Sequence, residues 1–443
     1  MKSQNANGSK VVRVGLLGLG NVGAGVAEIL ATHGAMIEAR AGVPIRIVKA
    51  LVRNKRRKRM GAAGNVALTT KASDIVGSPD VDVVVELMGG IEPALSHVTD
   101  ALAAGQTVVT ANKAIVAAHG KKIFQAARKS KRDVHFEAAV AGGIPIIRTL
   151  REALASDRIT ELTGILNGTT NYIVEAMASG QSYDSALAVA QHLGYAEADP
   201  TLDVNGADAA DKLAILIGLA FGASVTRAKL GCIGITELTS EMMMDAAELG
   251  YAIKLLARAR RVVQGDGETI QAGVFPYLVP LGHALSAVPD AQNAIYVQSD
   301  SLGTTLYQGP GAGGLPTGSA VVADLIEAAR NVAANTRGRS SAVLPNRSGP
   351  KLAKAGDSVC PWYIRLTVAE KPGVLAAITK LLADESISLA TVSQMQPSGD
   401  GHEVGIVLTT HPTSAGAMER ALKKMHRLKV VRGEAQVLRV YAE

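Results

Sequence analysis

A glycine-rich turn directly after a short apolar segment constrains the fold of this chain more than any other feature. Residues 11–17 read Val-Val-Arg-Val-Gly-Leu-Leu, which predicts a buried strand, and apolar residues recur at helical spacing over 24–32. Between them lies the G-x-G-x-x-G pattern of 18–23, which is typical of dinucleotide binding in this context, although a purely structural turn is the alternative. Such glycines let the backbone approach a pyrophosphate at the helix N-terminus. The candidate cofactor-binding residues of the turn are Gly18, Gly20, Asn21, Val22 and Gly23.

Strand-like and helix-like patterns alternate through the first 150 residues. The predicted strands after the first are 45–52, 81–87, 106–110 and 134–137, and the predicted helices are 93–104 and 113–129. Alternation of this kind predicts parallel βαβ units with right-handed crossovers. We therefore expect an α/β fold that begins with a Rossmann-type dinucleotide-binding domain over 1–150.

The rest of the chain divides by its composition. Residues 151–332 predict a mixed α/β domain whose last helices return to the Rossmann-type domain. Its predicted helices are 171–178, 182–193, 207–221 and 318–332, with loops at 194–203 and 309–316. Residues 333–359 are rich in Asn, Arg, Ser, Gly, Pro and Lys and predict a linker. Residues 360–443 follow the order βαββαβ, which is the ferredoxin-like pattern.

Composition excludes several classes of protein. In the 443 residues, 47 % are hydrophobic, so the chain can bury a large core and long disorder is not expected. Aromatic residues make up only 3 %, which argues against stacking on single-stranded nucleic acid, and a net charge of +7 is mild at this length. The two cysteines form no disulfide framework or zinc signature, and the 1–10 segment has no apolar signal region. The longest apolar run, 213–223, is too short to span a bilayer. We therefore expect a cytoplasmic protein.

The end of the second predicted strand bears on the choice between NAD and NADP. NAD-binding domains usually place an acidic residue there for the ribose hydroxyls, whereas this chain has Arg53. A guanidinium group suits a 2′-phosphate, which favours NADP and leaves NAD possible. The following basic run, 55–59, is more typical of a solvated loop. A nucleic-acid role for this run lacks an aromatic partner or a reading helix.

Two further segments carry candidate catalytic side chains. Lys113 follows the C-terminal end of a predicted strand, where α/β sheets bind ligands, although an exposed lysine is an equal alternative. Asp208 and Lys212 are spaced i, i+4 on one helix face, so the carboxylate can orient the amine and tune its pKa. Glu197 lies in the preceding loop and suits a substrate ammonium group. An exposed ion pair is the alternative for Asp208 and Lys212, but the helix around them is apolar.

Several motifs together resemble the homoserine dehydrogenase family over nearly the whole chain. They lie at 18–23, 110–113, 137–145, 164–172, 194–200 and 203–212. The C-terminal unit, with Glu-Lys-Pro-Gly-Val-Leu at 370–375, resembles an ACT domain. The resemblance implies reversible NAD(P)-dependent interconversion of L-homoserine and L-aspartate 4-semialdehyde, on the route to threonine, isoleucine and methionine.

The resemblance also implies roles for single residues. Lys212 would exchange a proton with the reacting oxygen, and Lys113 would lie between cofactor and substrate and share that task. Glu197 and Asp208 would bind and orient the amino end of homoserine and Lys212. Thr110, Gly194 and Gly313 match positions close to the cofactor in the family.

A monovalent-cation site is implied by the motif that begins at Glu137. The ligands would be Glu137 and the backbone carbonyls of Val140, Gly142 and Ile144. Hard oxygen donors suit Na⁺, and a structural turn is the alternative.

The ACT-like unit implies regulation by an amino acid, with threonine as the family expectation, and a homodimer or homotetramer. A unit that only dimerises is the alternative. Three rival functions stay open at this point: an oxidoreductase acting on another amino-acid substrate, an amino-acid sensor with an inactive nucleotide domain, and a nucleic-acid binder that uses 53–59. Intact Lys113, Asp208 and Lys212 argue against the sensor.

Overall fold

The computed structural model describes residues 11–264, 267–338, 349–395 and 402–442. The chain forms two compact units. The first unit comprises Met1–Thr160, Asp211–Lys229 and Gln292–Gly349, and the second comprises Glu161–Ala210, Leu230–Ala291 and Pro350–Glu443. Two predictions concern segments outside the described residues. These are the lack of a signal region at 1–10 and the centre of the predicted linker, 339–348.

A six-stranded parallel sheet is the centre of the first unit, in the order β3-β2-β1-β4-β5-β6. The strands are β1 (Val12–Leu17), β2 (Ile45–Leu51), β3 (Leu68–Thr69), β4 (Val83–Glu86), β5 (Thr107–Thr110) and β6 (Val134–His135). The predicted parallel βαβ units are thereby confirmed. Because the strand order reverses between β1 and β4, the carboxyl ends of these strands form the ligand crevice expected of a doubly wound sheet.

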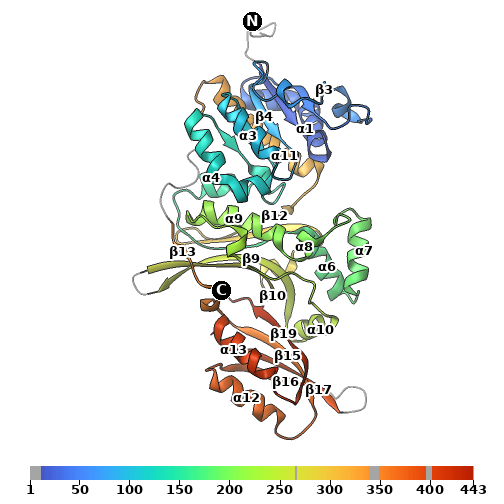
Figure 1. The fold of residues 1–443 in the computed structure, drawn as a ribbon, viewed down its shortest axis with the longest axis vertical. Helices are drawn as coiled ribbons and strands as arrows, with labels where there is room; N and C mark the ends of the chain where they lie inside the picture. Colours follow the sequence, from blue (N-terminus) through green and yellow to red (C-terminus); the bar gives the residue numbers. More distant parts are fainter. Residues whose placement is uncertain (1–10, 265–266, 339–348, 396–401, 443) are drawn as a thin grey trace. The chain divides into compact units, whose positions relative to one another are not determined.

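Two helices from opposite ends of the unit's sequence pack together through glycines. Helix α1 (Asn21–Thr32) follows β1, and α11 (Gly314–Ala333) contacts it over much of its length (Figure 1). A Cβ atom on Gly25 would overlap the carbonyl of Gly314, so the missing side chain permits the close approach. Buried side chains of both helices and of β1 belong to one apolar cluster. From Gly314 onward the chain therefore packs again beside the nucleotide sheet.

The start of α11 corrects one sequence prediction. A loop over 309–316 was expected, but 309–310 belong to strand β12 (Gly303–Pro310) and the helix begins at Gly314. Pro316 is tolerated because it lies in the first helical turn, where backbone N–H groups have no partner within the helix. The predicted strand 134–137 is also shorter, since Glu137–Ala139 is a 3₁₀ turn.

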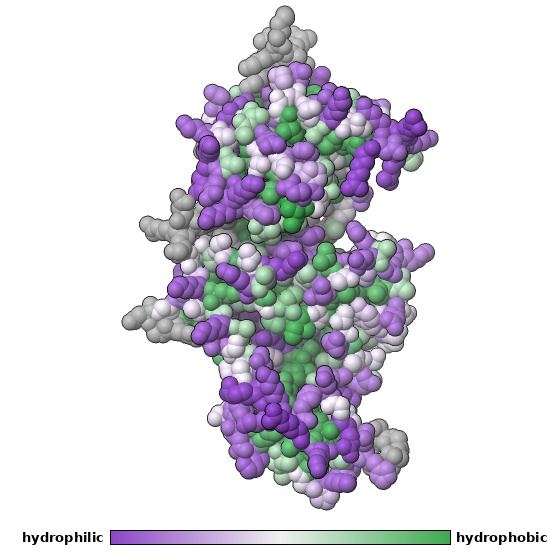
Figure 2. Space-filling view, in the orientation of Figure 1, coloured by the Kyte–Doolittle hydropathy of each residue, from purple (hydrophilic) through white to green (hydrophobic). Residues whose placement is uncertain are grey.

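The remaining helices of the nucleotide sheet are α2 (Gly34–Ala41), α3 (Ala94–Ala103) and α4 (Lys113–Ser130). The pair α3 and α4 contact each other and bury residues outside the α1–α11 cluster. The first unit also contains the short α5 (Ile146–Arg148), the antiparallel hairpin of β11 (Gln292–Ser299) with β12, and most of α9 (Ala207–Phe221). Hydrophilic residues cover most of the visible face of this unit in Figure 2, as expected where helices bury one apolar face against a sheet.

A long antiparallel hairpin dominates the second unit. Strands β9 (Tyr251–Gln264) and β10 (Gly267–Pro280) pair along their length, and β7 (Ile159–Ile165) pairs with β9. The C-terminal strand β19 (Val431–Val440) adds to β10 in parallel, so one sheet runs β7-β9-β10-β19-β15-β17-β16. Short strands β8 (Gly231–Cys232) and β13 (Lys351–Leu352) also pair with β10.

Helices of the second unit are α6 (Gly168–Ala178), α7 (Tyr183–His192), α8 (Thr201–Val204), the first turn of α9 and α10 (Ser240–Glu248). The prediction of helix 207–221 is confirmed to the residue. The polar loop expected at 194–203 contains part of a one-turn helix, because Pro200 begins the turn and Asp203 and Val204 donate to its carbonyl.

The C-terminal part has the predicted βαββαβ order. Its elements are β15 (Trp362–Ala369), α12 (Val374–Asp384), β16 (Leu389–Gln394), β17 (Glu403–Thr410), α13 (Ala415–Met425) and β19. The strands pair antiparallel, and one face buries an apolar cluster with both helices. Short strands β14 (Val359–Cys360) and β18 (Thr413–Ser414) pair beside it. Across the described residues, no helix is both long and apolar enough to cross a membrane.

Candidate functional site

The glycine turn has the geometry of a phosphate-binding turn. Gly18 directly follows β1 with φ +109°, and a Cβ atom there would lie 2.9 Å from the carbonyl oxygen of Leu87. A Cβ on Gly23 would lie 2.7 Å from the carbonyl oxygen of Gly18. Gly20 caps α1 without a side chain, and Asn21 and Val22 form its first turn. The turn therefore needs glycine at two of its three positions, and it leaves the N-terminal N–H groups of α1 available to an anion.

A hollow of about 550 Å³ lies beside this turn. Its wall includes Gly18 and Gly20, the end of β2, and the side chains of Arg53, Arg57 and Arg59. Arg53 and Arg57 are exposed. Three guanidinium groups beside a glycine turn suit an anionic nucleotide. The cradle and its charge therefore fit an anionic dinucleotide.

A buried polar network lies at the carboxyl ends of β4 and β5 in the same sheet. The Thr110 hydroxyl donates to the buried carboxylate of Glu86 at 2.6 Å. Asn112 donates to the Gly90 carbonyl at 2.7 Å and caps α4 through its side-chain oxygen. Lys113 is thereby fixed as the first residue of α4 and is half-buried. Glu86 was not among the predicted site residues. The valines of 83–85 before it predict a strand, and the sequence does not indicate that the Glu86 carboxylate makes buried hydrogen bonds.

Gly313 lies close to the glycine turn within the first unit. It precedes α11 with φ +125°, and a Cβ atom on the next residue, Gly314, would lie 2.7 Å from Oδ1 of Asn21. The N-termini of α1 and α11 are therefore neighbours. Gly194, the other predicted cofactor glycine after the turn, lies in the second unit with φ +76° at the end of α7.

The second unit brings three side chains together around Asp208. Asn167 precedes α6 and caps it by accepting from the backbone N–H of Thr170. Its amide nitrogen donates to Asp203 at 2.7 Å and to Asp208 at 2.9 Å. Asp208 is only 6 % exposed, so its carboxylate sits in a defined position at the start of α9. Asn167 and Asp203 were present in the quoted motifs but were not predicted as site residues.

The other predicted substrate residues are placed around the start of α9. Lys212 follows Asp208 by one helical turn and is half-buried. Glu197 is exposed between α7 and α8, and its carbonyl accepts from the side chain of Gln191 at 3.2 Å. Lys113 and Lys212 belong to the first unit, and Glu197 and Asp208 to the second. The predicted catalytic and substrate-binding residues thus belong to both units. Helix α9 carries Asp208 of the second unit and Lys212 of the first.

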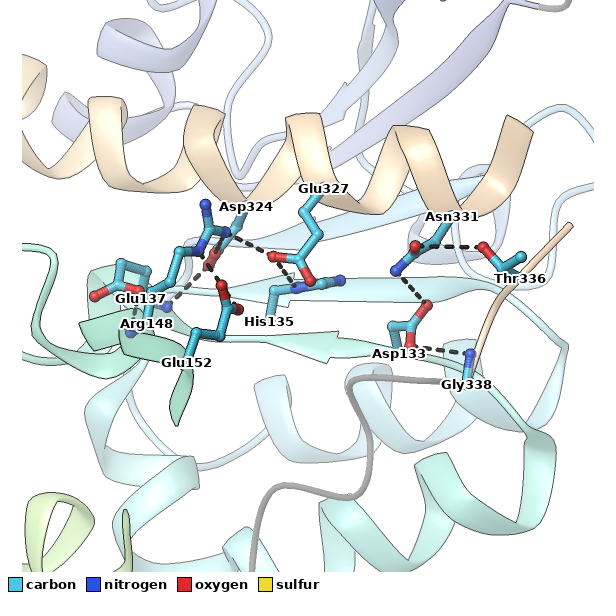
Figure 3. Close-up of polar contacts among 10 residues, drawn as sticks. All are labelled: Asp133, His135, Glu137, Arg148, Glu152, Asp324, Glu327, Asn331, Thr336 and Gly338. Atoms are coloured by element: carbon cyan, nitrogen blue, oxygen red, sulfur yellow. Dashed lines mark hydrogen bonds and ion pairs between the residues drawn. The ribbon is translucent and has the colours of Figure 1, made fainter. Parts of the chain in front are cut away.

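The predicted cation turn leads into a buried acidic cluster (Figure 3). Both carboxylate oxygens of Glu137 accept backbone N–H groups, from Ile147 and Arg148, each at 2.8 Å. The N–H of Glu137 donates to Asp324 of α11 at 2.8 Å, and Arg148 donates to Glu327 at 2.7 Å. Burial raises the pKa of Glu137. Burial and the neighbouring Glu137 raise the pKa of Asp324 to about 8.

The oxygen atoms around Glu137 have the chemistry that a monovalent cation requires. Glu137, Val140, Gly142 and Ile144 are all buried. Within the part of the chain that the structure describes, no backbone N–H outside regular elements donates to the carbonyls of Val140 or Gly142, whereas Ile144 accepts from Ile146. Each carboxylate oxygen of Glu137 keeps a lone pair after its one hydrogen bond. The residues present therefore fit a hard cation, although no cluster of three or more His, Cys, Asp or Glu side chains suited to a metal occurs among the described residues.

Comparison with known proteins agrees with this geometry. The family model described as "Homoserine dehydrogenase, NAD binding domain" matches residues 18–137, that of "Homoserine dehydrogenase" matches 145–326, and that of the ACT domain matches 362–429. A curated homoserine dehydrogenase of Bacillus subtilis is 39 % identical over 436 residues, covering 97 % of this chain and 98 % of that protein.

Two solved structures show the same relationship. A homoserine dehydrogenase from Thiobacillus denitrificans is 43 % identical, with a TM-score of 0.91 and coverage of 98 % of both chains. A hyperthermophilic archaeal homoserine dehydrogenase in complex with NADPH is 27 % identical, with a TM-score of 0.60, and covers 72 % of this chain and 97 % of that one.

The doubly wound sheet with its glycine turn, the mixed α/β part and the ACT domain define an NAD(P)-dependent oxidoreductase with a C-terminal ACT domain. Matches over nearly the full length identify its family: the chain belongs to the homoserine dehydrogenases.

Proposed function

We propose that this chain catalyses reversible hydride transfer between L-homoserine and L-aspartate 4-semialdehyde, with NADP as the preferred cofactor. The observation that carries the proposal is the arrangement at the start of α9. There a buried carboxylate, Asp208, is held by Asn167 one helical turn before Lys212. A fixed carboxylate followed by an amine on the same helix face is suited to binding an amino-acid substrate and handling its proton.

The substrate's two ends require different groups. Homoserine carries an ammonium group, for which Glu197 and Asp208 supply negative charge. It also carries a hydroxyl group at the carbon that reacts. Lys212 exchanges a proton with that oxygen and stabilises its negative charge in the transition state, and Lys113, at the N-terminus of α4, shares this task.

When bound, the nicotinamide accepts or supplies the hydride. The first unit's own residues bind and orient it: Gly18, Gly20 and Gly23 make room for the pyrophosphate, and α1 presents its N-terminus to it. Asn21 and Val22 belong to the same turn, and Thr110, Gly194 and Gly313 are proposed to lie against the cofactor. Arg53, in the wall of the adjoining hollow, faces the 2′-phosphate that distinguishes NADP. A related archaeal enzyme was solved with NADPH, which supports this preference.

The turn after Glu137 is proposed as a sodium site. Its ligands are Glu137 and the carbonyls of Val140, Gly142 and Ile144, and buried oxygen donors support this assignment. A cation there would neutralise one of the buried carboxylates and hold the connection between β6 and α5 in place.

Regulation and assembly are proposed from the C-terminal unit. Its match to ACT domains supports control by an amino acid, with threonine as the expected effector, and a homodimer or homotetramer. We also propose the division into 1–150, 151–332, a linker at 333–359 and an ACT domain at 360–443, and a cytoplasmic location. The two cysteines, both free, are consistent with that location.

The reverse reaction tests this function without relying on the equilibrium of the forward one. Purified chain is mixed with NADPH and L-aspartate 4-semialdehyde, and loss of the NADPH absorbance band is followed, with L-homoserine identified as the product. Oxidation of NADPH should be far slower when succinate semialdehyde replaces L-aspartate 4-semialdehyde, because succinate semialdehyde lacks the ammonium group. Equal rates with both aldehydes, or no product, would refute the assignment.

A further inference from the structure

A small hollow in the second unit is lined by three arginines that the proposed reaction does not use. It lies on the sheet at β10 and β19, beside the segment that leads into β15, and has a volume of about 50 Å³. Arg258 and Arg260 of β9 and Arg439 of β19 contribute to its lining. Among the described residues that line it, there is no aspartate or glutamate.

Only one of these arginines is paired with a carboxylate that the structure records. Arg258 forms a buried ion pair with Glu161 at 2.8 Å. Arg260 donates to the side-chain oxygen of Gln271, at 3.2 and 3.3 Å, and to the Val359 carbonyl at 3.0 Å. Both acceptors of Arg260 are neutral, so its charge is not compensated by them.

Arg439 is held in a fixed position and also makes neutral contacts. Its guanidinium group lies between two aromatic rings, 4.0 Å from the centroid of Phe275 and 4.6 Å from that of Trp362. One of its nitrogens donates to the Ser358 hydroxyl at 3.3 Å and to the Cys360 sulfur at 3.4 Å. Contact with both rings restricts the directions in which the remaining N–H groups of Arg439 can point.

The platform under Arg439 depends on glycine. A Cβ atom on Gly231 would lie 2.7 Å from the ring of Phe275, and one on Gly273 would overlap the same ring. The ring therefore occupies the space that two side chains would fill, and the guanidinium group of Arg439 lies 4.0 Å from the centroid of this ring. The hollow is built by packing that places two guanidinium groups beside it, neither of which is in a recorded ion pair.

We propose that this hollow binds the oxyanion group of a small ligand, as free phosphate or sulfate or as the carboxylate of a small acid. An oxyanion would supply the negative charge that Arg260 and Arg439 lack and would accept their forked N–H groups and the Ser358 hydroxyl. A volume of about 50 Å³ holds a few waters or one group of four or five heavy atoms, so only the oxyanion itself fits. Because the lining joins β9 and β10 to β14 and β19, bound anion would link the hairpin to the C-terminal unit.

Phosphate binding to the full-length chain tests the site by isothermal titration at constant ionic strength set with sodium chloride. Saturating NADP⁺ is present throughout, so that the cofactor site is occupied and the measured heat does not come from phosphate binding there. We expect one saturable site per chain and at least tenfold weaker binding in Arg439→Gln and in Arg260→Gln, made separately so that one folding failure leaves the other informative. Arg432→Gln, on the same strand as Arg439 but outside the hollow, should bind as the parent does.

Parallel titrations with acetate identify the kind of oxyanion. The site is supported if phosphate or acetate binds to the parent and if this binding is weakened in the two arginine variants. The anion that binds then identifies the ligand class. Absence of saturable binding by both anions overturns the proposal, as does binding that Arg439→Gln and Arg260→Gln leave unchanged.

Discussion

The side-chain amide of Asn167 donates to the carboxylate of Asp208 at 2.9 Å, and its second hydrogen reaches Asp203 at 2.7 Å. Asn167 also caps α6 through its side-chain oxygen, so its position is set by backbone as well as side-chain bonds. One neutral residue thus separates two carboxylates and orients the one that precedes Lys212 by a helical turn. This geometry makes Asn167 a positioning residue for the proposed substrate site.

Replacing Asn167 by aspartate should disturb this arrangement without removing the cap. Asn167→Asp keeps an oxygen for the Thr170 N–H but places a third carboxylate group against Asp203 and Asp208. Loss of a buried donor costs about 1–3 kcal/mol, so kcat/KM for homoserine should fall about 10- to 100-fold. The KM for NADP⁺ should hardly change, which a purely structural role would not predict.

The matched control is Asn205→Asp. Asn205 is exposed, and within the described part of the chain its side chain accepts only the Ala207 N–H, at 2.9 Å, so aspartate can replace it. Near-parent activity of Asn167→Asp, or equal losses in both variants, would remove Asn167 from the site.

Arg53 should set the preference between the two nicotinamide cofactors. In Arg53→Gln the charge-assisted contact with the 2′-phosphate is lost, and the KM for NADP⁺ should rise about 10- to 100-fold while that for NAD⁺ stays within about twofold. Lys58→Gln removes an exposed charge from the same basic run but outside the hollow, and should leave both constants unchanged. Steady-state kinetics with both cofactors provides the measurement; parallel changes for both would show that Arg53 does not read the phosphate.

Sodium dependence should reside in the Glu137 turn. Glu137→Gln removes the charge while keeping one acceptor oxygen for a backbone N–H, so we expect activation by Na⁺ over choline chloride to be lost. Glu152→Gln removes a nearby half-exposed carboxylate that pairs with Arg148 and serves as the control. If the Glu137 variant is activated by Na⁺ as strongly as the parent, the ion binds elsewhere.

The buried pair of Arg258 and Glu161 should dominate the electrostatic part of the second unit's stability. Arg258 donates two bonds of 2.8 Å to Glu161, stacks 4.5 Å from the Tyr441 ring centroid, and donates to the Ala442 carbonyl. Arg258→Met or Glu161→Gln alone should lower the free energy of unfolding by about 3–5 kcal/mol, because each leaves an unpaired buried group. The double variant should lose less than the sum of the two.

Denaturant unfolding of the three variants supplies this double-mutant cycle. The exposed pair of Arg158 and Asp300, half-exposed on both sides, is the comparison and should contribute under about 1 kcal/mol. Strictly additive losses for Arg258 and Glu161 would show that the two side chains do not interact energetically.

Much of the fold was predictable because its signals are local. The strand before the glycine turn, the alternation through β6 and the βαββαβ order each follow from apolar periodicity within a few residues. Helix α9 was predicted to the residue because Asn205 and Gly206 precede a long apolar face. Signals of this kind do not depend on any distant part of the chain.

The long hairpin and the polar contacts escaped prediction because their partners are distant in sequence. Strand β9 carries Lys254, Arg258 and Arg260 in an apolar run, and this mixture is typical of neither a strand nor a helix. Arg258 is buried there only because Glu161, 97 residues earlier, pairs with it. Asn167 looks like an ordinary helix cap until Asp208, 41 residues later, is placed beside it.

The proposed chemistry depends above all on Lys212, and one experiment addresses this residue directly. NADP⁺ reduction by L-homoserine is measured at the NADPH absorbance band for the parent, for Lys212→Ala and for the exposed control Lys229→Ala, while NADPH binding is measured by fluorescence. We expect Lys212→Ala to lose at least about 100-fold in kcat while binding NADPH like the parent, and Lys229→Ala to be fully active. Substantial turnover by Lys212→Ala, or loss of its NADPH binding, would contradict the proposed role of Lys212.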